Sequence, residues 1–314
     1  MEENIIEYKV AIICTVFNHA KYIEDAMLGF VRQKTSFPYC ALMIDDCSTD
    51  GTQEIIQKYE SIYPDVIKGI YLPRNLYNEP LEKKKYVEPW IQKTQYLAFC
   101  EGDDYWINDY KLQRQVDFLD THPDYLLHFH NGLTRWQDKD LPDYILSDFK
   151  SGDFTIGKLF KKWQLPYASV VMRKEVLDVP LYMELNKVYW GGFCKFIAAA
   201  SAGKVYGLAE CLSVYRRNDG GVSNWMSDAY CIELDMRFAL VSKDKEAINF
   251  MKRWILKQFV IMMPRYIMGS KYAKEFVDRL KVFDPRLFYY AILLTPFMYP
   301  FHAIKRIKEK LSHD

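Results

Sequence analysis

Three carboxylates fall within four residues in the stretch "AFCEGDDYWIND", at Glu101, Asp103 and Asp104. Like charges this close repel one another, and acidic side chains are seldom buried without a compensating partner. Hard divalent cations such as Mg²⁺ and Mn²⁺ prefer carboxylate oxygens and keep open positions for water and substrate phosphates. The spacing therefore indicates either a divalent cation site or acids that only form a turn or cap a helix.

A second acidic pair, Asp45-Asp46, ends the apolar run "CALMIDD". Both acidic groups follow apolar segments that read as strands, and the segments between the expected strands have helical spacing. Strands that alternate with helices predict a parallel sheet covered on both faces, with ligands beyond the carboxyl ends of the strands. We therefore expect the two acidic groups to share one crevice.

The composition bounds the class of protein. Half of the 314 residues are apolar and the net charge is +1, which predicts a large core and gives no reason to expect a nucleic-acid partner. Seven cysteines without a CxxC pair suggest reduced thiols, and the first residues do not resemble a signal peptide. We expect a cytoplasmic protein with an α/β domain over residues 1–225 and a helical extension over 226–314.

Three ordered motifs and one later segment carry a family resemblance. The motifs are "VAIICTVFNHAKYIEDAMLGFVRQ", "MIDDCSTDGTQEII" and "AFCEGDDYWINDYKLQRQVDFLDTHPDY", and the later segment is "SAGKVYGLAECLSVYRRNDGGVS". Over roughly residues 8–225 the chain resembles the inverting glycosyltransferases of family two. The resemblance implies the GT-A fold, a mixed and mostly parallel sheet between helices. It also implies a nucleotide-sugar donor, UDP-linked in our interpretation, and Mn²⁺ or Mg²⁺.

The resemblance assigns roles to particular positions. Thr15, Phe17 and Asn18 match the nucleotide-binding turn, and Asp46 matches the carboxylate that reads a uracil-type base. Asp103 corresponds to the ribose-side or metal-side acid and Asp104 to the metal ligand, whereas Asp45 is expected to form a turn. Four residues are expected near the sugar or the diphosphate: Glu101, Trp106, Arg216 and Asn218. Trp106 could equally well pack in the core, and Arg216 could equally well be an ordinary surface residue.

The position of the general base departs from the family pattern. Relatives carry an Asp in a "GD" or "ED" pair about a dozen residues before "GK", and here the pair is Gly191-Gly192. Three interpretations remain open: an active transferase with another base, a silent nucleotide-sugar-binding homologue, or a partner subunit of an active enzyme. Glu184 is the nearest upstream acid and Asp178 the next.

The segment 286–310 is apolar and aromatic and ends in Lys305, Arg306, Lys308 and Lys310. Its uncharged part is shorter than the about 20 residues that a spanning helix needs, and it contains two prolines. It fits a membrane-surface anchor, or else a helix packed on the catalytic domain or on a partner in a homo-oligomer. An anchor at the inner face of the cell membrane would suit a lipid-linked or glycan acceptor in cell-surface polysaccharide synthesis.

Overall fold

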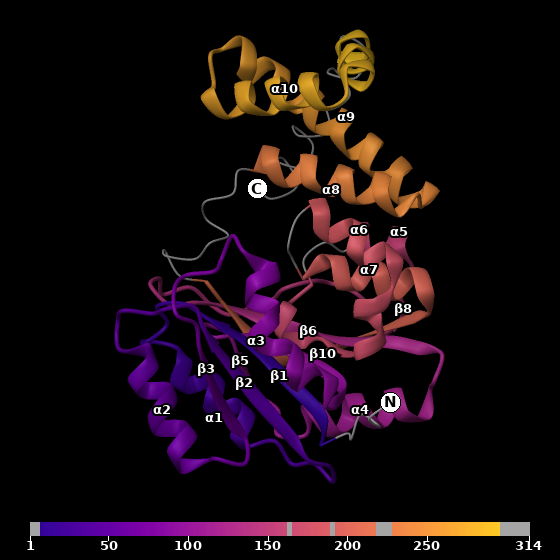
Figure 1. The fold of residues 1–314 in the computed structure, drawn as a ribbon. Coiled ribbons are helices and arrows are strands. Elements are labelled where there is room, and N and C mark those ends of the chain that lie inside the picture. The colour runs from indigo at the N-terminus through magenta and orange to yellow at the C-terminus, as the bar shows by residue number, and fades with distance from the viewer. Residues whose placement is uncertain (1–6, 162–164, 189–191, 218–227, 296–314) are drawn as a thin grey trace. The chain divides into compact units, whose positions relative to one another are not determined.

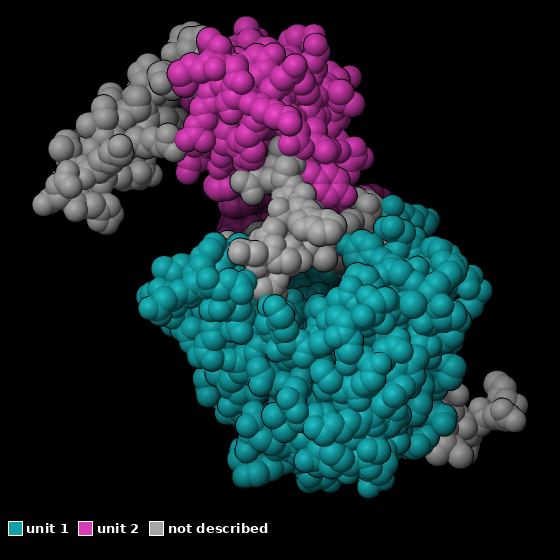
Figure 2. Space-filling view, turned by 90° about the vertical axis from the view of Figure 1, so that its left-hand side faces the viewer, with its two compact units in different colours: residues 1–155, 162–219 teal, residues 156–161, 220–314 magenta. Residues whose placement is uncertain are grey.

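The computed structural model describes residues 7–161, 165–188, 192–217 and 228–295. The chain forms two compact units, shown in Figure 2. The first comprises residues 1–155 and 162–219, and we call it the catalytic unit after the activity that the family resemblance implies. The second, here the helical unit, comprises residues 156–161 and 220–314. The expected boundary at 225 lies outside the described residues.

The catalytic unit is built on a ten-stranded mixed sheet with the path β3-β2-β1-β4-β9-β6-β10-β5 (Figure 1). Strands β1 to β4 pair in parallel, and β9 runs antiparallel to both β4 and β6. The strands are β1 (Tyr8–Val16), β2 (Tyr39–Asp45), β3 (Ile67–Tyr71), β4 (Thr94–Glu101), β5 (Tyr105–Trp106), β6 (Tyr125–Trp136), β7 (Tyr144–Ile145), β8 (Gly152–Asp153), β9 (Val171–Arg173) and β10 (Lys204–Arg217).

Helices lie between most of the strands of this unit, in the expected alternation. They are α1 (Ile23–Val31), α2 (Thr52–Ile62), α3 (Pro80–Gln92), α4 (Lys111–Thr121), α6 (Pro180–Val188) and α7 (Phe193–Ala202), with short 3₁₀ turns η1 (Tyr167–Ser169) and η2 (Lys174–Asp178). Helix α1 buries an apolar stripe that includes Ile23, Met27 and Phe30, and carries Glu24 and Asp25 in its first turn, where carboxylates complement the helix dipole.

Strand β1 lies inside the sheet, between β2 and β4, and is buried on both faces. Val10, Ile12 and Cys14 on one face of the strand are fully buried in the core, and Ala11 on the other face is fully buried as well. A near-continuous apolar run of this kind is typical of a parallel strand covered by helices on both sides. The expected mixed, mostly parallel fold is confirmed.

The segment after α7 reads in the sequence as two short strands, and this prediction is wrong, because the segment forms the single strand β10 of 14 residues. The pairing of β10 with β6 shifts register between Leu208 and Cys211 and again between Cys211 and Ser213. Such irregularities interrupt the alternation of side chains between the faces, which makes one bent strand look like two in sequence.

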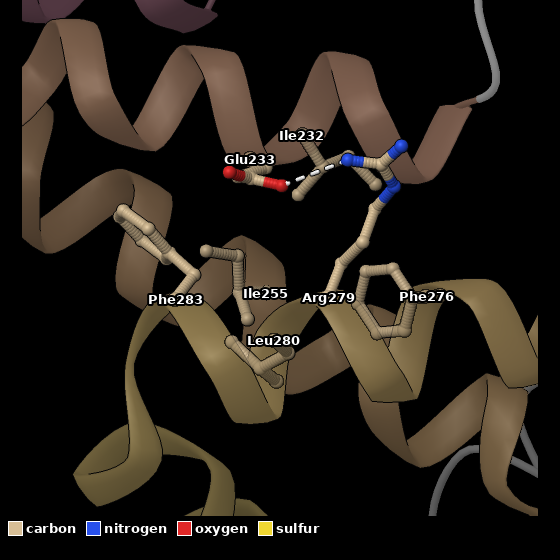
Figure 3. Close-up of a pocket in the computed structure, with 7 residues that line it drawn as sticks. All are labelled: Ile232, Glu233, Ile255, Phe276, Arg279, Leu280 and Phe283. Carbon is tan, nitrogen blue, oxygen red and sulfur yellow. Dashed lines mark hydrogen bonds and ion pairs between the residues drawn. The ribbon is translucent and has the colours of Figure 1, made fainter.

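The helical unit contains α5 (Ile156–Lys161), α8 (Asp228–Ser242), α9 (Lys245–Ile267), α10 (Lys271–Phe283) and a helix over residues 285–295. Figure 3 shows a small cavity between α8, α9 and α10, where Arg279 bonds Glu233 at 3.2 Å. Apolar side chains line the rest of this cavity, so its contacts hold the helices together. Within the described part of the chain, no helix combines the length and apolar composition that crossing a bilayer takes.

Candidate active site at the carboxyl edge of the sheet

The sheet register brings the two acidic groups together. Thr15 pairs with Glu101, and Val16, the next residue of β1, pairs with Asp45. The chain continues from both neighbours with backbone hydrogen bonds to β1, from Gly102 N to Thr15 O and from Asp46 N to Val16 O. The expected juxtaposition of the acids at one edge of the sheet is confirmed.

The carboxylates of Glu101, Asp103 and Asp104 repel one another, and burial leaves them little water to screen that repulsion. Burial, followed by the charge of Asp103, raises the pKa of Glu101 to about 7. Burial also raises the pKa of Asp104 well above its usual range, with Asp103 and Glu101 as further causes. Asp104 is 1% exposed, and its Oδ2 has no hydrogen-bond partner. The cluster therefore needs positive charge that the surrounding protein does not fully provide.

A divalent cation fits this donor set. Asp103 is partly exposed, and Asp104 has one buried oxygen without a partner. No trio of His, Cys, Asp or Glu within the described ranges is arranged to hold a metal. Two carboxylates are nevertheless the usual protein share of a Mg²⁺ site that also binds substrate phosphates.

Arg216 is a buried cation beside the acids. It is 4% exposed, and its backbone N–H donates to Asp104 Oδ1 at 2.8 Å. Its guanidinium lies 4.6 Å from the ring centre of Tyr105 and 5.1 Å from that of Tyr22. Nη2 pairs with Asp25 Oδ2 at 2.6 Å, whereas Nε and Nη1 have no partner. Because leaving guanidinium donors unsatisfied is costly, these groups suit an anionic ligand.

The turn after β1 is fixed by the turn after β2. Asn18 has a φ of 55°, a region that Asn tolerates better than most residues. Its N–H donates to Ser48 Oγ and its Oδ1 accepts from Thr49 N, both at 2.9 Å. This pairing leaves Phe17 45% exposed at the edge of the sheet, where its ring is free to stack on a planar ligand.

Asp46 has partners that the sequence did not reveal. Its Oδ2 pairs with Lys83 Nζ of α3 at 2.6 Å, and its Oδ1 accepts from Leu76 N at 2.6 Å. A carboxylate can accept further hydrogen bonds, so a base N–H can be added to this arrangement or can displace the lysine. Asp45 accepts from Ser48 N at 3.0 Å and from Gln53 Nε2 at 2.6 Å, in agreement with its predicted role in a turn.

Trp106 does not lie where a sugar could touch it. It is 1% exposed, and its Nε1 donates to Ala168 O at 2.8 Å. Its ring packs edge-on against Phe30, and Lys111 Nζ lies 4.0 Å from the ring centre. The expectation of sugar contact is corrected to core packing, because the ring is almost fully buried and its indole N–H is bonded inside the protein.

The family's base position is occupied by another side chain. A Cβ added at Gly192 would lie 2.8 Å from Cε2 of Tyr167 and still closer to Cδ2. Glu184, the substitute proposed from sequence, is exposed on α6 and forms no hydrogen bond or ion pair with the described residues. Gly191 and Asn218 lie outside the described residues.

Sequence reasoning missed three polar side chains near the acids, namely Lys83, Lys195 and His19. Gly102 lets His19 approach, since an added Cβ would lie 2.7 Å from His19 Nδ1. Burial lowers the pKa of His19, although the charge of Asp103 opposes this shift. The three lysines in a row were a visible signal for Lys83, whereas nothing local in the sequence marked His19 or Lys195.

Comparison with known proteins identifies the family of the chain. The family model described as "Glycosyl transferase family 2" matches residues 11–173, more than half of the chain, so the chain belongs to this family. An uncharacterised protein of Mycobacterium tuberculosis (strain ATCC 25618 / H37Rv) is 30% identical over 220 residues, 68% of this chain and 60% of that protein. The chain thus spans about three fifths of that relative's length.

Other similar proteins have more informative names. The putative teichuronic acid biosynthesis glycosyltransferase TuaG of Bacillus subtilis is 37% identical over 111 residues, 35% of this chain and 41% of TuaG. The crystal structure of S. aureus TarS in complex with UDP-GlcNAc superposes with a TM-score of 0.64 at 16% identity, covering 93% of this chain and 89% of that one. At that identity the likeness establishes the GT-A fold.

Proposed function

We propose that this protein is a metal-dependent inverting glycosyltransferase that moves a sugar from a UDP-linked donor to a glycan or lipid-linked acceptor. One observation carries the proposal: at the edge of the sheet, Asp104 Oδ2 and the Nε and Nη1 of Arg216 are buried without partners, in residues joined by the hydrogen bond from Arg216 N to Asp104 Oδ1. A nucleoside diphosphate with a divalent cation provides the partner that each of them lacks. Family membership provides the reaction class.

The donor would lie along the carboxyl ends of β1, β2 and β4. Phe17, with its exposed ring, would stack on the base, and Asp46 would accept a hydrogen bond from a base N–H. Thr15 and Asn18 would shape the floor of this part of the site. Asp103 and Asp104 would hold Mn²⁺ or Mg²⁺, which when bound offsets the charge that develops on the departing diphosphate.

The protein side chains would then orient the leaving group. Arg216 would donate from Nε and Nη1 to diphosphate oxygens while Asp25 and two tyrosine rings hold its plane in place. Donors fixed in this way stabilise developing charge without reorganising during the reaction. Glu101 directly precedes Gly102 and is partly exposed, and it would help to position the sugar or the ribose.

An acceptor at a membrane surface suits the helical unit. Its exposed apolar side chains include Ile267 and Met268 at the end of α9 and Val282 in α10. Lys252, Arg253 and Arg286 line one hollow of this unit with Tyr290. Basic residues grouped with an exposed tyrosine, on a unit that also exposes apolar side chains, suit a surface that lies on anionic lipid, so we propose attachment to the inner face of the cell membrane.

The alternative function is a silent nucleotide-sugar-binding homologue. It is favoured by Gly192, whose missing side chain cannot be replaced without moving Tyr167. Both functions predict that UDP binds, and only the first predicts turnover.

The experiment incubates the whole chain and Mn²⁺ with a panel of UDP- and GDP-sugars and with membrane extract as acceptor, and it follows nucleotide release. We expect release from a UDP-sugar that requires both Mn²⁺ and acceptor. Binding of UDP without release from any donor would favour the silent homologue. Release from GDP-sugars alone would refute uracil as the nucleobase of the donor.

A further inference from the structure

The ring of Tyr167 fills the space beside Gly192, so this position has no general base. A cation, Lys195, lies next to that ring. Gly192 has φ −60° and ψ −34°, an ordinary helical conformation, so its backbone does not require glycine. The ring of Tyr167 requires it, because the ring occupies the volume that any larger side chain would need. The tyrosine is itself fixed by packing at 5.0 Å, between ring centres, against Phe99 of β4.

Lys195 lies one turn further along the same helix. Its Nζ is 4.9 Å from the ring centre of Phe99 and 5.2 Å from that of Tyr167. Burial disfavours the ammonium, whereas the faces of the Phe99 and Tyr167 rings give it favourable cation–π partners. A partly exposed lysine flanked by two aromatic rings therefore lies beside the Tyr167 ring that fills the base position.

Glu101 connects this lysine to the acidic cluster. Phe99 and Glu101 are two residues apart in β4, so their side chains leave the same face of the strand. Lys195 Nζ, 4.9 Å from the Phe99 ring centre, therefore lies on the face from which Glu101 projects. A group bound at Lys195 would be near the donor sugar.

We propose that Lys195, positioned by Tyr167, binds an acceptor oxygen that is already ionised, in a phosphate monoester or a carboxylate, so that transfer requires no general base at residue 192. This inference rests on the proposed function, since it concerns the acceptor of that reaction. A hydroxyl must lose a proton as it attacks, which calls for a base within hydrogen-bond reach. An oxyanion has no proton to lose and instead needs a cation to bind and orient it.

The reaction balances without proton transfer. One acceptor oxygen forms a bond to the anomeric carbon from the face opposite the leaving group. The bond between that carbon and the diphosphate oxygen breaks, and its electron pair leaves with the nucleoside diphosphate. The products are a glycosyl phosphate, or a glycosyl ester for a carboxylate acceptor, and the free nucleoside diphosphate.

The test compares three amphiphiles that share a dodecyl chain: dodecyl phosphate, dodecyl β-D-glucuronide and the neutral dodecyl β-D-glucoside. Each is titrated by calorimetry, below its micelle concentration, into the whole protein saturated with UDP and Mn²⁺. We expect an anionic amphiphile to bind about 10- to 100-fold more tightly than the glucoside, the range of a charge-assisted hydrogen bond. Lys195→Met should remove that preference, and Lys195→Arg should restore part of it.

Matched controls separate binding from structure. Lys187→Met removes an exposed lysine from α6 and should leave every titration unchanged. Thermal unfolding and UDP affinity of Lys195→Met should match the wild type, because a purely structural role would alter them and would not distinguish anionic from neutral amphiphiles. With a sugar donor, dodecyl phosphate should yield a glycosyl phosphate by mass spectrometry.

Three results would overturn the inference. Equal binding of the three amphiphiles, or an anionic preference that survives Lys195→Met, would show that Lys195 does not select an oxyanion. Loss of affinity for UDP-glucuronate relative to UDP-glucose in Lys195→Met, with dodecyl phosphate unaffected, would place the oxyanion on the donor. Failure of UDP itself to bind would refute the proposed function, and this inference with it.

Discussion

The two units of the chain carry opposite charge. The catalytic unit has 24 lysines and arginines against 31 aspartates and glutamates, whereas the helical unit has 18 against 10. The net charge of +1 for the whole chain conceals this separation. A balanced total therefore excludes fewer partners than it first suggests, because an anionic surface would meet one unit and not the average of both.

The units also differ in where polar groups are left unpaired. In the catalytic unit, Asp104 Oδ2, His19 Nδ1 and two nitrogens of Arg216 lack partners near the edge of the sheet. Among the described residues of the helical unit, the unpaired buried side-chain atom is Asp235 Oδ1, whose carboxyl has its pKa raised to about 8 by burial. Clustering of unpaired groups at one edge distinguishes a binding site from an isolated buried acid.

The largest expected effect concerns the basic surface. Replacing Lys252, Arg253 and Arg286 together by Gln should weaken binding to vesicles that contain anionic phospholipid by about 100-fold, since each basic residue near such a surface contributes about 1 kcal/mol. Vesicle co-sedimentation at low and physiological salt measures the change. All three side chains are exposed, so the fold should be unaffected.

The matched control neutralises three exposed lysines of the catalytic unit, Lys34, Lys58 and Lys150. It should leave vesicle binding within a few-fold of the wild type. Equal losses in the two triple variants would mean that the charge separation has no bearing on membrane attachment.

The next effect concerns the buried cation of the catalytic unit. Arg216→Met should weaken UDP binding by about 10- to 100-fold and uridine binding much less, because the guanidinium is expected to contact the diphosphate. Its partner Asp25 has a side chain 56% exposed and can be solvated after the change, so folding should persist. Calorimetry with UDP and uridine gives both affinities.

Arg217 provides the comparison for Arg216. It is the next residue of β10, and its guanidinium lies 4.8 Å from the Trp136 ring centre. Arg217→Met should leave UDP affinity nearly unchanged. Comparable losses in the two variants would indicate a general effect of strand charge and not a contact made by Arg216.

The smallest expected effect concerns Lys111, a buried amine that is not part of the candidate active site. Lys111 is fully buried, donates to Gln115 Oε1 at 2.8 Å, and has its pKa lowered to about 7 by burial. Between pH 7 and 10 the unfolded chain therefore binds the proton that the folded protein has lost, and stability rises with pH. From pH 6 to 9 the wild type should gain about 1–3 kcal/mol relative to Lys111→Met.

Urea unfolding of both proteins at the two pH values measures this difference. The other titrating groups are common to both and cancel in the comparison. A constant difference between the two proteins would show that the Lys111 amine is not neutralised inside the fold.

The sequence predicted the parts of the site that follow from local pattern. Acids at the ends of apolar runs predicted that Glu101 and Asp46 would meet at one edge, and strand pairing through β1 confirms it. It could not predict contacts between distant segments, such as Lys83 with Asp46 or the Tyr167 ring at Gly192. It also could not decide between the two interpretations of Trp106, because the burial of that ring depends on Ala168, 62 residues away.

The most direct test of the central claim is a calorimetric titration of the whole chain with UDP, with Mn²⁺ and with EDTA, for the wild type and for Asp103→Asn. Asp109→Asn serves as the control, since Asp109 lies in the same segment but pairs with Lys34 at 3.7 Å. We predict that UDP binds to the wild type and to the control only with Mn²⁺, and that Asp103→Asn loses this binding. Mn²⁺-dependent binding of UDP that survives in Asp103→Asn would contradict the assignment of the metal site, and absence of binding to the wild type would contradict the proposed function.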